Sequence, residues 1–176
     1  STLYEWENKF NVVNMHELKV QHFLRRNSRY QAKKNISAHY DLGNKLYEKF
    51  LDPSMMYSSA IYPTPDATLA EAQENKLRSI CDKLQLTASD HLVEIGTGWG
   101  GLAIYAAKNY GCKVTTTTIS DEQYAFAQEW VTKEGLDDKI TLLKKDYRLL
   151  EGKFDKLVSI EMIEAVGKAY LASFFK

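Results

Sequence analysis

A carboxylate and a series of glycines follow one another where an apolar segment ends. Glu94 lies two residues before Gly96, and Gly98 and Gly101 complete a G-x-G-x-x-G spacing. Glycines in such a turn let a ligand approach the backbone at the start of the next helix. Dinucleotide-binding proteins share this spacing, but a carboxylate at position 94 repels a phosphate and attracts a cation. The combination predicts binding of S-adenosylmethionine, which carries an ammonium and a positive sulfonium.

A second polar group stands at the end of the next apolar segment. Proteins that bind nucleotides on a parallel sheet usually hold the ribose with an acid about 20 residues after the glycines. This segment instead ends in threonine, and Thr118 with Gln123 one turn later can bond the ribose hydroxyls. The strand preference of threonine explains residues 115–117 without a ligand, and it explains Thr118 less well.

These groups need a framework, and the hydrophobic pattern after residue 90 predicts an α/β fold. Ser120 is the expected N-cap of one helix. Strands are expected at 91–95, 113–118, 140–143 and 156–160, and helices at 102–110, 122–134 and a last one that includes 170–175. This alternation is typical of a doubly wound, Rossmann-like parallel sheet.

The first half of the chain predicts helices and loops instead. Asp52-Pro53 should end one helix, and Thr68 is a good N-cap for another. The expected helices are 15–26, 39–51 and 69–86, with a loop at 57–66. We therefore divide the chain into an N-terminal helical lid and substrate-side segment, residues 1–86, and a cofactor-binding core, residues 87–176.

Composition and charge limit the partners. The 176 residues are 44% hydrophobic, enough to bury one core, and 23 basic residues balance 23 acidic ones. This balance argues against a nucleic-acid-binding protein. Residues 18–40, however, contain no acid, while Lys19, Arg25, Arg26, Arg29, Lys33 and Lys34 are basic. The segment is either a solvated arm or a surface that attracts anionic lipid headgroups.

The cysteines and the chain start bear on the cellular setting. Cys81 and Cys112 lie in apolar contexts, so core packing is their expected role. The sequence has no apolar run of membrane-spanning length and no signal peptide. Because the chain begins at Ser1 rather than at methionine, we expect a missing upstream segment. The expected setting is cytoplasmic, with peripheral attachment to the inner membrane face as an option.

Several motifs follow one another in the order of a known enzyme family. They are HYDLGN at 39–44, LDP at 51–53, YSSA at 57–60, LAEAQENK at 69–76, EIGTGWGG at 94–101, TISDEQ at 118–123, DYR at 146–148 and SIEMIEAVG at 159–167. From about residue 25 onward the chain resembles the cyclopropane-fatty-acid synthase and mycolic acid cyclopropane synthase family.

The resemblance implies a class I S-adenosylmethionine-dependent methyltransferase sheet with an N-terminal helical extension. It also implies transfer of a methyl or methylene group to the double bond of an unsaturated fatty acyl chain or phospholipid. In the family, the alkene attacks the sulfonium methyl, and a bound bicarbonate removes a proton from the resulting cation. The residues that match cofactor-contacting positions are Tyr57, Ser58, Gly96, Gly98, Thr118, Ile119, Gln123, Tyr147 and Arg148.

The same resemblance assigns the expected catalytic residues. Glu164 matches the carboxylate that holds bicarbonate, Tyr40 is a wall of that site, and Ser59 helps to hold the anion. Glu161 lies three residues before Glu164, so both can face the cleft on one helical turn. We favour Glu164 for the chemistry and take Glu161 as a structural or cofactor-side group. No metal is expected.

Departures from the family pattern leave the product open between a cyclopropane, a methyl branch and a methylene branch. Well-known members carry cysteine at the position of Ser59 and histidine at that of Ala165. The chain also stops at Lys176 after its fourth predicted strand, so the C-terminal strands of the sheet are expected to be missing. Two alternatives stay open: a methyltransferase of small molecules, and a non-catalytic fragment that binds cofactor or membrane only. The oligomeric state, acyl position and headgroup are also open.

Overall fold

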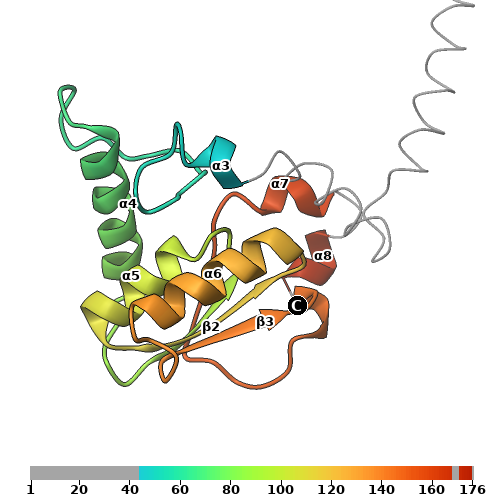
Figure 1. Ribbon diagram of the computed structural model, residues 1–176. Coiled ribbons are helices and arrows are strands. Elements are labelled where there is room, and N and C mark those ends of the chain that lie inside the picture. Colours follow the sequence, from blue (N-terminus) through green and yellow to red (C-terminus); the bar gives the residue numbers. More distant parts are fainter. Residues whose placement is uncertain (1–43, 168–170, 176) are drawn as a thin grey trace, which may run out of the picture.

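The computed structural model describes residues 44–167 and 171–175, which form a parallel sheet with helices packed on it (Figure 1). The predicted helix 15–26, Tyr40 and the basic segment 18–40 lie outside the described residues. The strands are β1 (His91–Ile95), β2 (Lys113–Thr118), β3 (Ile140–Lys144) and β4 (Lys156–Ser159). The helices are α3 (Asn44–Tyr47), α4 (Leu69–Lys83), α5 (Gly101–Tyr110), α6 (Asp121–Lys133), the 3-10 helix η1 (Tyr147–Leu149), α7 (Ile163–Val166) and α8 (Leu171–Phe174).

The sheet has the strand order β3-β2-β1-β4, and all its neighbouring strands are parallel. The chain therefore steps from β1 to β2 and β3 on one side and then crosses to the other side of β1 to form β4. In such sheets ligands bind outside the carboxyl ends of the strands, where the order reverses. The turn that follows β1 stands at that point.

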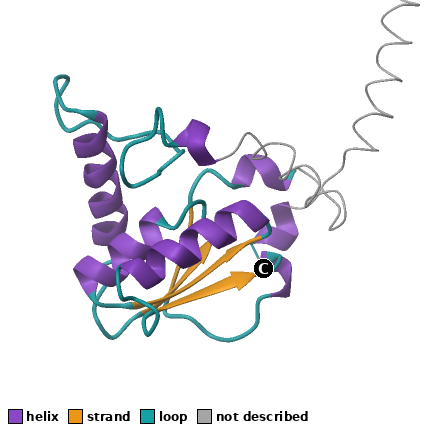
Figure 2. Cartoon of the chain, viewed as in Figure 1, coloured by secondary structure: helices purple, strands orange, loops and turns teal. Residues whose placement is uncertain are grey.

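Helices α5 and α6 connect successive strands that step in the same direction. Because parallel crossovers are almost always right-handed, both helices cover the same face of the sheet, and Figure 2 shows α6 crossing in front of the strands. The core between them is built from fully buried side chains, among them Leu92, Val114, Leu102 and Val131. Helix α4 packs against α5 and adds side chains to the same cluster.

Both cysteines belong to this core. Cys81 comes from α4 and Cys112 lies directly before β2, and both are completely buried. Burial raises the pKa of the Cys81 thiol to about 12. The expected packing role is confirmed.

Helix starts follow the predicted capping residues. Thr68 accepts a hydrogen bond from the backbone N–H of Glu71, whose side chain in turn accepts one from the backbone N–H of Thr68, which completes a capping box. Ser120 caps α6 by accepting a bond from the backbone N–H of Gln123. Within the described part of the chain, no helix has both the length and the apolar character needed to cross a membrane.

The helix expected at 39–51 is regular over Asn44–Tyr47 only, among the described residues. Beyond it, the backbone N–H groups of Lys49 and Phe50 bond to carbonyls three residues back, which tightens the chain into turns before Pro53. Helix α4 likewise ends at Lys83, three residues earlier than predicted, because Gln85 takes a left-handed backbone with φ of 51°.

Candidate cofactor site

The turn after β1 is built from glycines that no other residue replaces easily. Gly96 and Gly98 have φ of 95° and 54°, which L side chains rarely adopt. A Cβ added at Gly98 would meet no atom of the described chain within 4 Å, so the backbone there is open to a ligand. At Gly101 an added Cβ would overlap the carbonyl oxygen of Ser54. Gly101 thus lets the loop before Tyr57 lie directly on the start of α5.

Glu94 lies beneath this turn and is buried. Its carboxylate accepts a hydrogen bond from Thr116 Oγ1 at 2.6 Å, and Thr116 is bonded to the Thr97 hydroxyl at 2.7 Å. Burial raises the pKa of Glu94 to about 8, and the bond from Thr116 opposes the shift. At neutral pH its charged form therefore needs a cationic partner. This refines the expectation of a simple fixed negative charge at this position.

Thr118 and Gln123 meet at the carboxyl end of β2, and both side chains are buried. The Thr118 hydroxyl donates to Gln123 Oε1 at 3.0 Å and accepts from the backbone N–H of Ser120. Because the Gln123 amide oxygen is used in this way, its Nε2 remains as the donor that a ribose hydroxyl could accept. Ile119 lies between the two residues and continues the chain from β2 into α6.

The three preceding threonines also have bonded hydroxyls. Thr115 is bonded to His91 Nε2 at 2.8 Å, Thr116 to Glu94, and Thr117 to the backbone carbonyl of Lys145. Strand preference alone, our explanation for residues 115–117, is therefore incomplete. Each hydroxyl joins β2 to a neighbouring segment.

The loop that carries Tyr57, Ser58 and Ser59 lies against the start of α5. Tyr57 is 51% exposed, and its ring lies edge-to-face with the rings of Tyr47 and Trp99, with centroids 5.6 and 6.4 Å apart. Trp99 is buried, and its indole N–H donates to Asn44 Oδ1 at 2.9 Å. Trp99 therefore packs the loop onto α3, and the half-exposed Tyr57 lies beside Trp99 of the glycine turn.

Ser59 is bonded to Glu161. The backbone N–H and the hydroxyl of Ser59 both donate to Glu161 Oε1, at 3.0 and 2.7 Å. The expectation that Glu161 and Glu164 share one helical turn is wrong, because α7 begins only at Ile163 and Glu161 has a left-handed backbone with φ of 47°. Glu164 lies within α7, and its side chain is outside what the structure describes.

Tyr147 and Arg148 follow the carboxyl end of β3, on the same edge of the sheet. Asp146 caps η1 and holds the Arg148 guanidinium, with Nε at 2.8 Å from Oδ1. Arg148 also lies over the Tyr147 ring, and Tyr147 meets Phe174 of α8 edge-on at 5.4 Å. Asp146, which we did not select from the sequence, thus fixes the direction of Arg148.

Two further residues were missed. Gln73 and Lys76 of α4 are 2% and 4% exposed and bond to the loop at Met56 and Ser58. Both lie on the side of α4 that also buries Ala72, Leu77 and Cys81, but no pattern in the sequence indicated a buried lysine.

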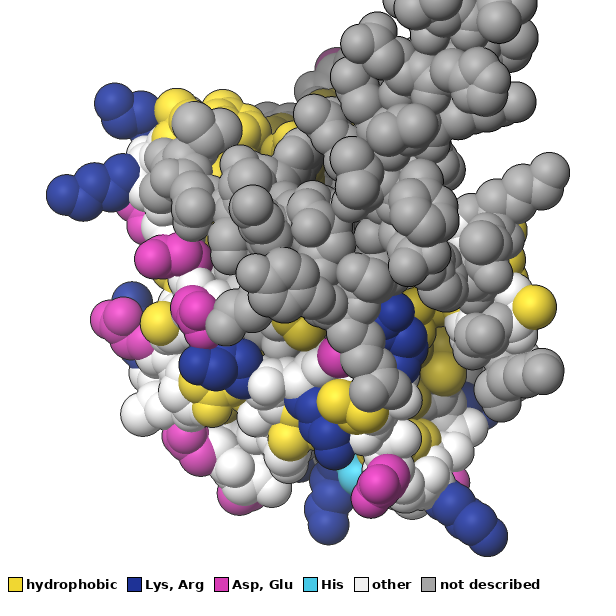
Figure 3. Space-filling view, turned by 90° about the vertical axis from the view of Figure 1, so that its right-hand side faces the viewer, with side chains coloured by type: hydrophobic (Ala, Val, Ile, Leu, Met, Phe, Trp, Pro, Cys, Tyr) yellow, Lys and Arg dark blue, Asp and Glu magenta, His cyan; other side chains and the backbone are white. Residues whose placement is uncertain are grey.

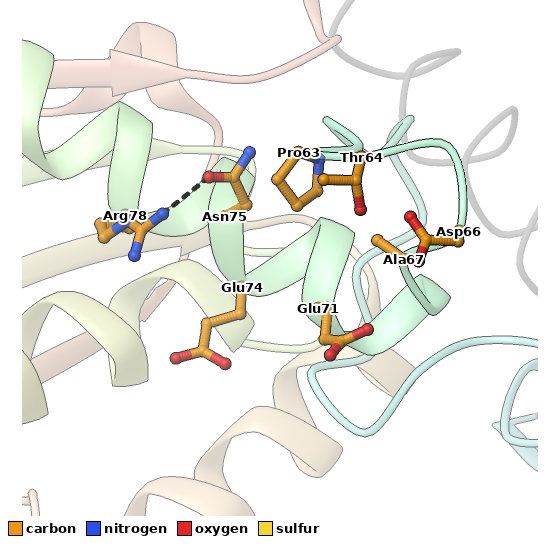
Figure 4. A pocket seen from close by; sticks show the side chains of 8 residues that line it. All are labelled: Pro63, Thr64, Asp66, Ala67, Glu71, Glu74, Asn75 and Arg78. Atoms are coloured by element: carbon orange, nitrogen blue, oxygen red, sulfur yellow. Dashed lines mark hydrogen bonds between the residues drawn. The ribbon is translucent and has the colours of Figure 1, made fainter.

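A surface hollow on α4 is unrelated to these groups. It is lined by Pro63, Thr64, Asp66, Ala67, Glu71, Glu74, Asn75 and Arg78 (Figure 4). Arg78 donates to Asn75 Oδ1 there, and Glu71 completes the capping box of α4. None of the predicted site residues lines this hollow.

A parallel sheet with a glycine turn, a buried carboxylate after β1 and polar groups after β2 and β3 defines a Rossmann-like, class I methyltransferase fold. Residues 27–176 match the mycolic acid cyclopropane synthetase family. The chain belongs to this family.

Individual relatives agree with this assignment. A probable fatty acid methyltransferase of Pseudomonas putida is 48% identical over 139 residues, and the cyclopropane-fatty-acyl-phospholipid synthase of Escherichia coli K12 is 48% identical over 137. Each alignment covers 78% of this chain and 35% of the relative, so the chain spans about a third of their length. The structure is similar to mycolic acid cyclopropane synthase CmaA1 with SAH and CTAB, at TM-score 0.78 and 31% identity over 81% of this chain and 50% of the other.

Proposed function

We propose that the protein carrying this chain transfers a methyl or methylene group from S-adenosylmethionine to the double bond of an unsaturated fatty acyl chain. The observation that carries the proposal is the family membership, with a cyclopropane-fatty-acyl-phospholipid synthase at 48% identity. The geometry supports it, because the glycine turn after β1 and the polar pair Thr118 and Gln123 after β2 lie at the switch point of the sheet. A solved relative, mycolic acid cyclopropane synthase CmaA1, was obtained in complex with SAH and CTAB, which supports binding of this cofactor class.

The described residues fit the proposed cofactor. Gly98 leaves open space at the backbone, and the Gln123 amide nitrogen can donate to a ribose hydroxyl. The ammonium of the cofactor would favour the charged form of Glu94, whose pKa is raised by burial. The cofactor supplies an electrophilic methyl group on a sulfonium. An aromatic ring such as that of the half-exposed Tyr57 can stabilise such a cation by about 0.5–2 kcal/mol.

After the alkene has taken the methyl group, the acyl chain must lose a proton to close a ring. A carboxylate or a held bicarbonate can take that proton and leaves no strong nucleophile beside the cation. We propose Glu164 as the residue that holds bicarbonate, with Ser59 at the edge of the same site. The contact between Ser59 and Glu161 puts a second carboxylate there, able to accept a proton or to exclude an added anion.

Two experiments with the full-length protein test this proposal, one on purified protein and one in cells that express it. Calorimetry should show binding of S-adenosylhomocysteine and none of NAD. Lipids of a host rich in unsaturated phospholipid, analysed by mass spectrometry after expression, should gain one carbon on the acyl chain. Binding of NAD with no response to S-adenosylhomocysteine would reject the proposal. Methylation of a polar small molecule instead of lipid would favour the alternative, a methyltransferase of small molecules.

We further propose peripheral attachment to anionic membrane through residues 18–40, on the cytoplasmic side. The support is the charge of the sequence alone, about 1 kcal/mol for each basic residue close to the surface. On the described face in Figure 3, basic and acidic side chains are interspersed. Sedimentation with anionic vesicles should weaken with added salt and with charge reversal at Arg25, Arg26 and Arg29. Equal binding to neutral vesicles leaves only a solvated arm.

A further inference from the structure

A lysine and a glutamine are buried side by side on α4, facing the loop that carries Ser58. Gln73 and Lys76 are three residues apart and thus share one face of the helix. They are 2% and 4% exposed, next to Ala72 and Leu77 of the core. A buried ammonium is destabilising unless its geometry is well satisfied, and an apolar side chain of similar size often packs as well or better. The presence of Lys76 therefore calls for a reason other than packing.

Both side chains donate to the same short piece of backbone. Gln73 Nε2 donates to the carbonyls of Met56 and Ser58 at 3.1 and 2.9 Å. Lys76 Nζ donates to the carbonyl of Ser58 at 3.0 Å and to its hydroxyl at 2.7 Å. Gln73 Oε1 is buried and has no partner among the described residues, so this amide is oriented by the loop carbonyls alone. The pair fixes residues 56–58 onto α4.

Two opposing influences act on the pKa of Lys76. Desolvation lowers the pKa of its ammonium, while the carboxylates of Glu161 and Asp52 act in the opposite direction. Lysine carries donors only. The Ser58 oxygen must therefore accept from Lys76, and the Ser58 hydroxyl hydrogen points to some other acceptor. A positive charge behind a hydroxyl also makes that hydroxyl a better donor to an anion.

We propose that Lys76 is a positioning residue for the amino-acid end of the cofactor, acting through Ser58. Lys76 donates to Ser58, and Ser58 donates to the ligand's carboxylate, while Gln73 holds the loop in register. The inference rests on the proposed function, because it takes S-adenosylmethionine as the ligand. It assigns to a residue of α4, outside the glycine turn, part of the recognition of one end of that ligand.

Two ligands separate this role from a structural one. S-adenosylhomocysteine has the amino-acid end, whereas 5′-methylthioadenosine has the same adenosine and sulfur without it. Lys76→Met keeps the length of the side chain and removes the charge. Calorimetry should show S-adenosylhomocysteine binding weakened by about tenfold or more, with 5′-methylthioadenosine binding unchanged within about twofold. Lys83→Met, at an exposed lysine of the same helix, is the matched control and should change neither.

Ser58→Ala removes the hydroxyl that relays the effect of Lys76 to the ligand, and it keeps the proposal testable if Lys76→Met does not fold. It should weaken S-adenosylhomocysteine alone, and adding Lys76→Met to it should cost little more, because both act through one bond. Equal weakening of both ligands, additive effects, or unchanged binding would overturn the relay. An unmodified protein that binds no S-adenosylhomocysteine would instead overturn the proposed function.

Discussion

Ser59 and Glu161 are 102 residues apart in the sequence, and two donors of Ser59 meet one carboxylate oxygen of Glu161. The contact joins the loop after α3 to the chain that leaves β4. Any anion that used the Ser59 donors would have to displace the Glu161 carboxylate or lie against it. The two residues together therefore decide which negative charge stands at this point of the site.

Glu161→Gln should consequently make turnover more dependent on added bicarbonate. The amide keeps the size of the side chain and removes the repulsion of a bound anion. Rates of acyl-chain methylation, measured with and without bicarbonate, should respond more strongly in the variant than in the unmodified protein. An identical response in both would show that no anion approaches Ser59.

Glu164→Gln should strongly reduce turnover and leave the affinity for S-adenosylhomocysteine nearly unchanged. The reason is that the proposed role of Glu164 begins after the methyl group has moved, and a loss confined to that stage appears in kcat rather than in cofactor binding. Product formation by mass spectrometry and calorimetric titration measure the two quantities. Full activity in this variant would mean that the proton leaves by another route.

Glu94 should make the unmodified protein less stable as pH rises from about 4.5 to about 8. Its pKa is raised from 4.5 to about 8 by burial, so between these values the folded chain binds more protons than the unfolded chain. Stability then falls with increasing pH. Glu94→Gln should flatten this dependence, as measured by urea unfolding at pH 5, 6.5 and 8. Parallel pH dependences in the two proteins would contradict the shift.

Gly101→Ala should destabilise the fold by about 1–3 kcal/mol, the usual cost of overpacking. The added methyl group meets the Ser54 carbonyl, a backbone atom that cannot rotate away. Urea unfolding measures the loss. Asn109→Ala, at an exposed position of the same helix, is the control and should change stability little. A Gly101 variant as stable as the control would mean that the loop lies less tightly on α5 than the structure shows.

The sheet and its helices could be predicted closely, because apolar period and capping residues both indicate the same elements. The strand expected at 113–118 is β2 without change, and the four strands are parallel as predicted. The glycine turn could be placed for the same reason, since it directly follows a strongly apolar strand. The assignment of Tyr57, Ser58 and the other cofactor contacts stays a prediction, as does the boundary at residue 86.

The contacts between distant segments could not be predicted. The helical period of α4 shows that Lys76 lies on the inward side of the helix. It does not show that a loop 18 residues earlier in the sequence packs against that side. Glu161 was placed on a helix because its spacing from Glu164 fits one turn. Spacing carries no information about backbone φ, and the left-handed residue moves the helix start to Ile163.

The left-handed backbone at Glu161 sets stability and chemistry against each other at one position. Glycine adopts such a φ without steric penalty, so the residue that would relax the chain is also one that has no carboxylate. Random variants selected only for heat resistance should therefore drift toward glycine here and lose the negative charge beside Ser59. Selection for lipid methylation should hold the glutamate in place despite its strain.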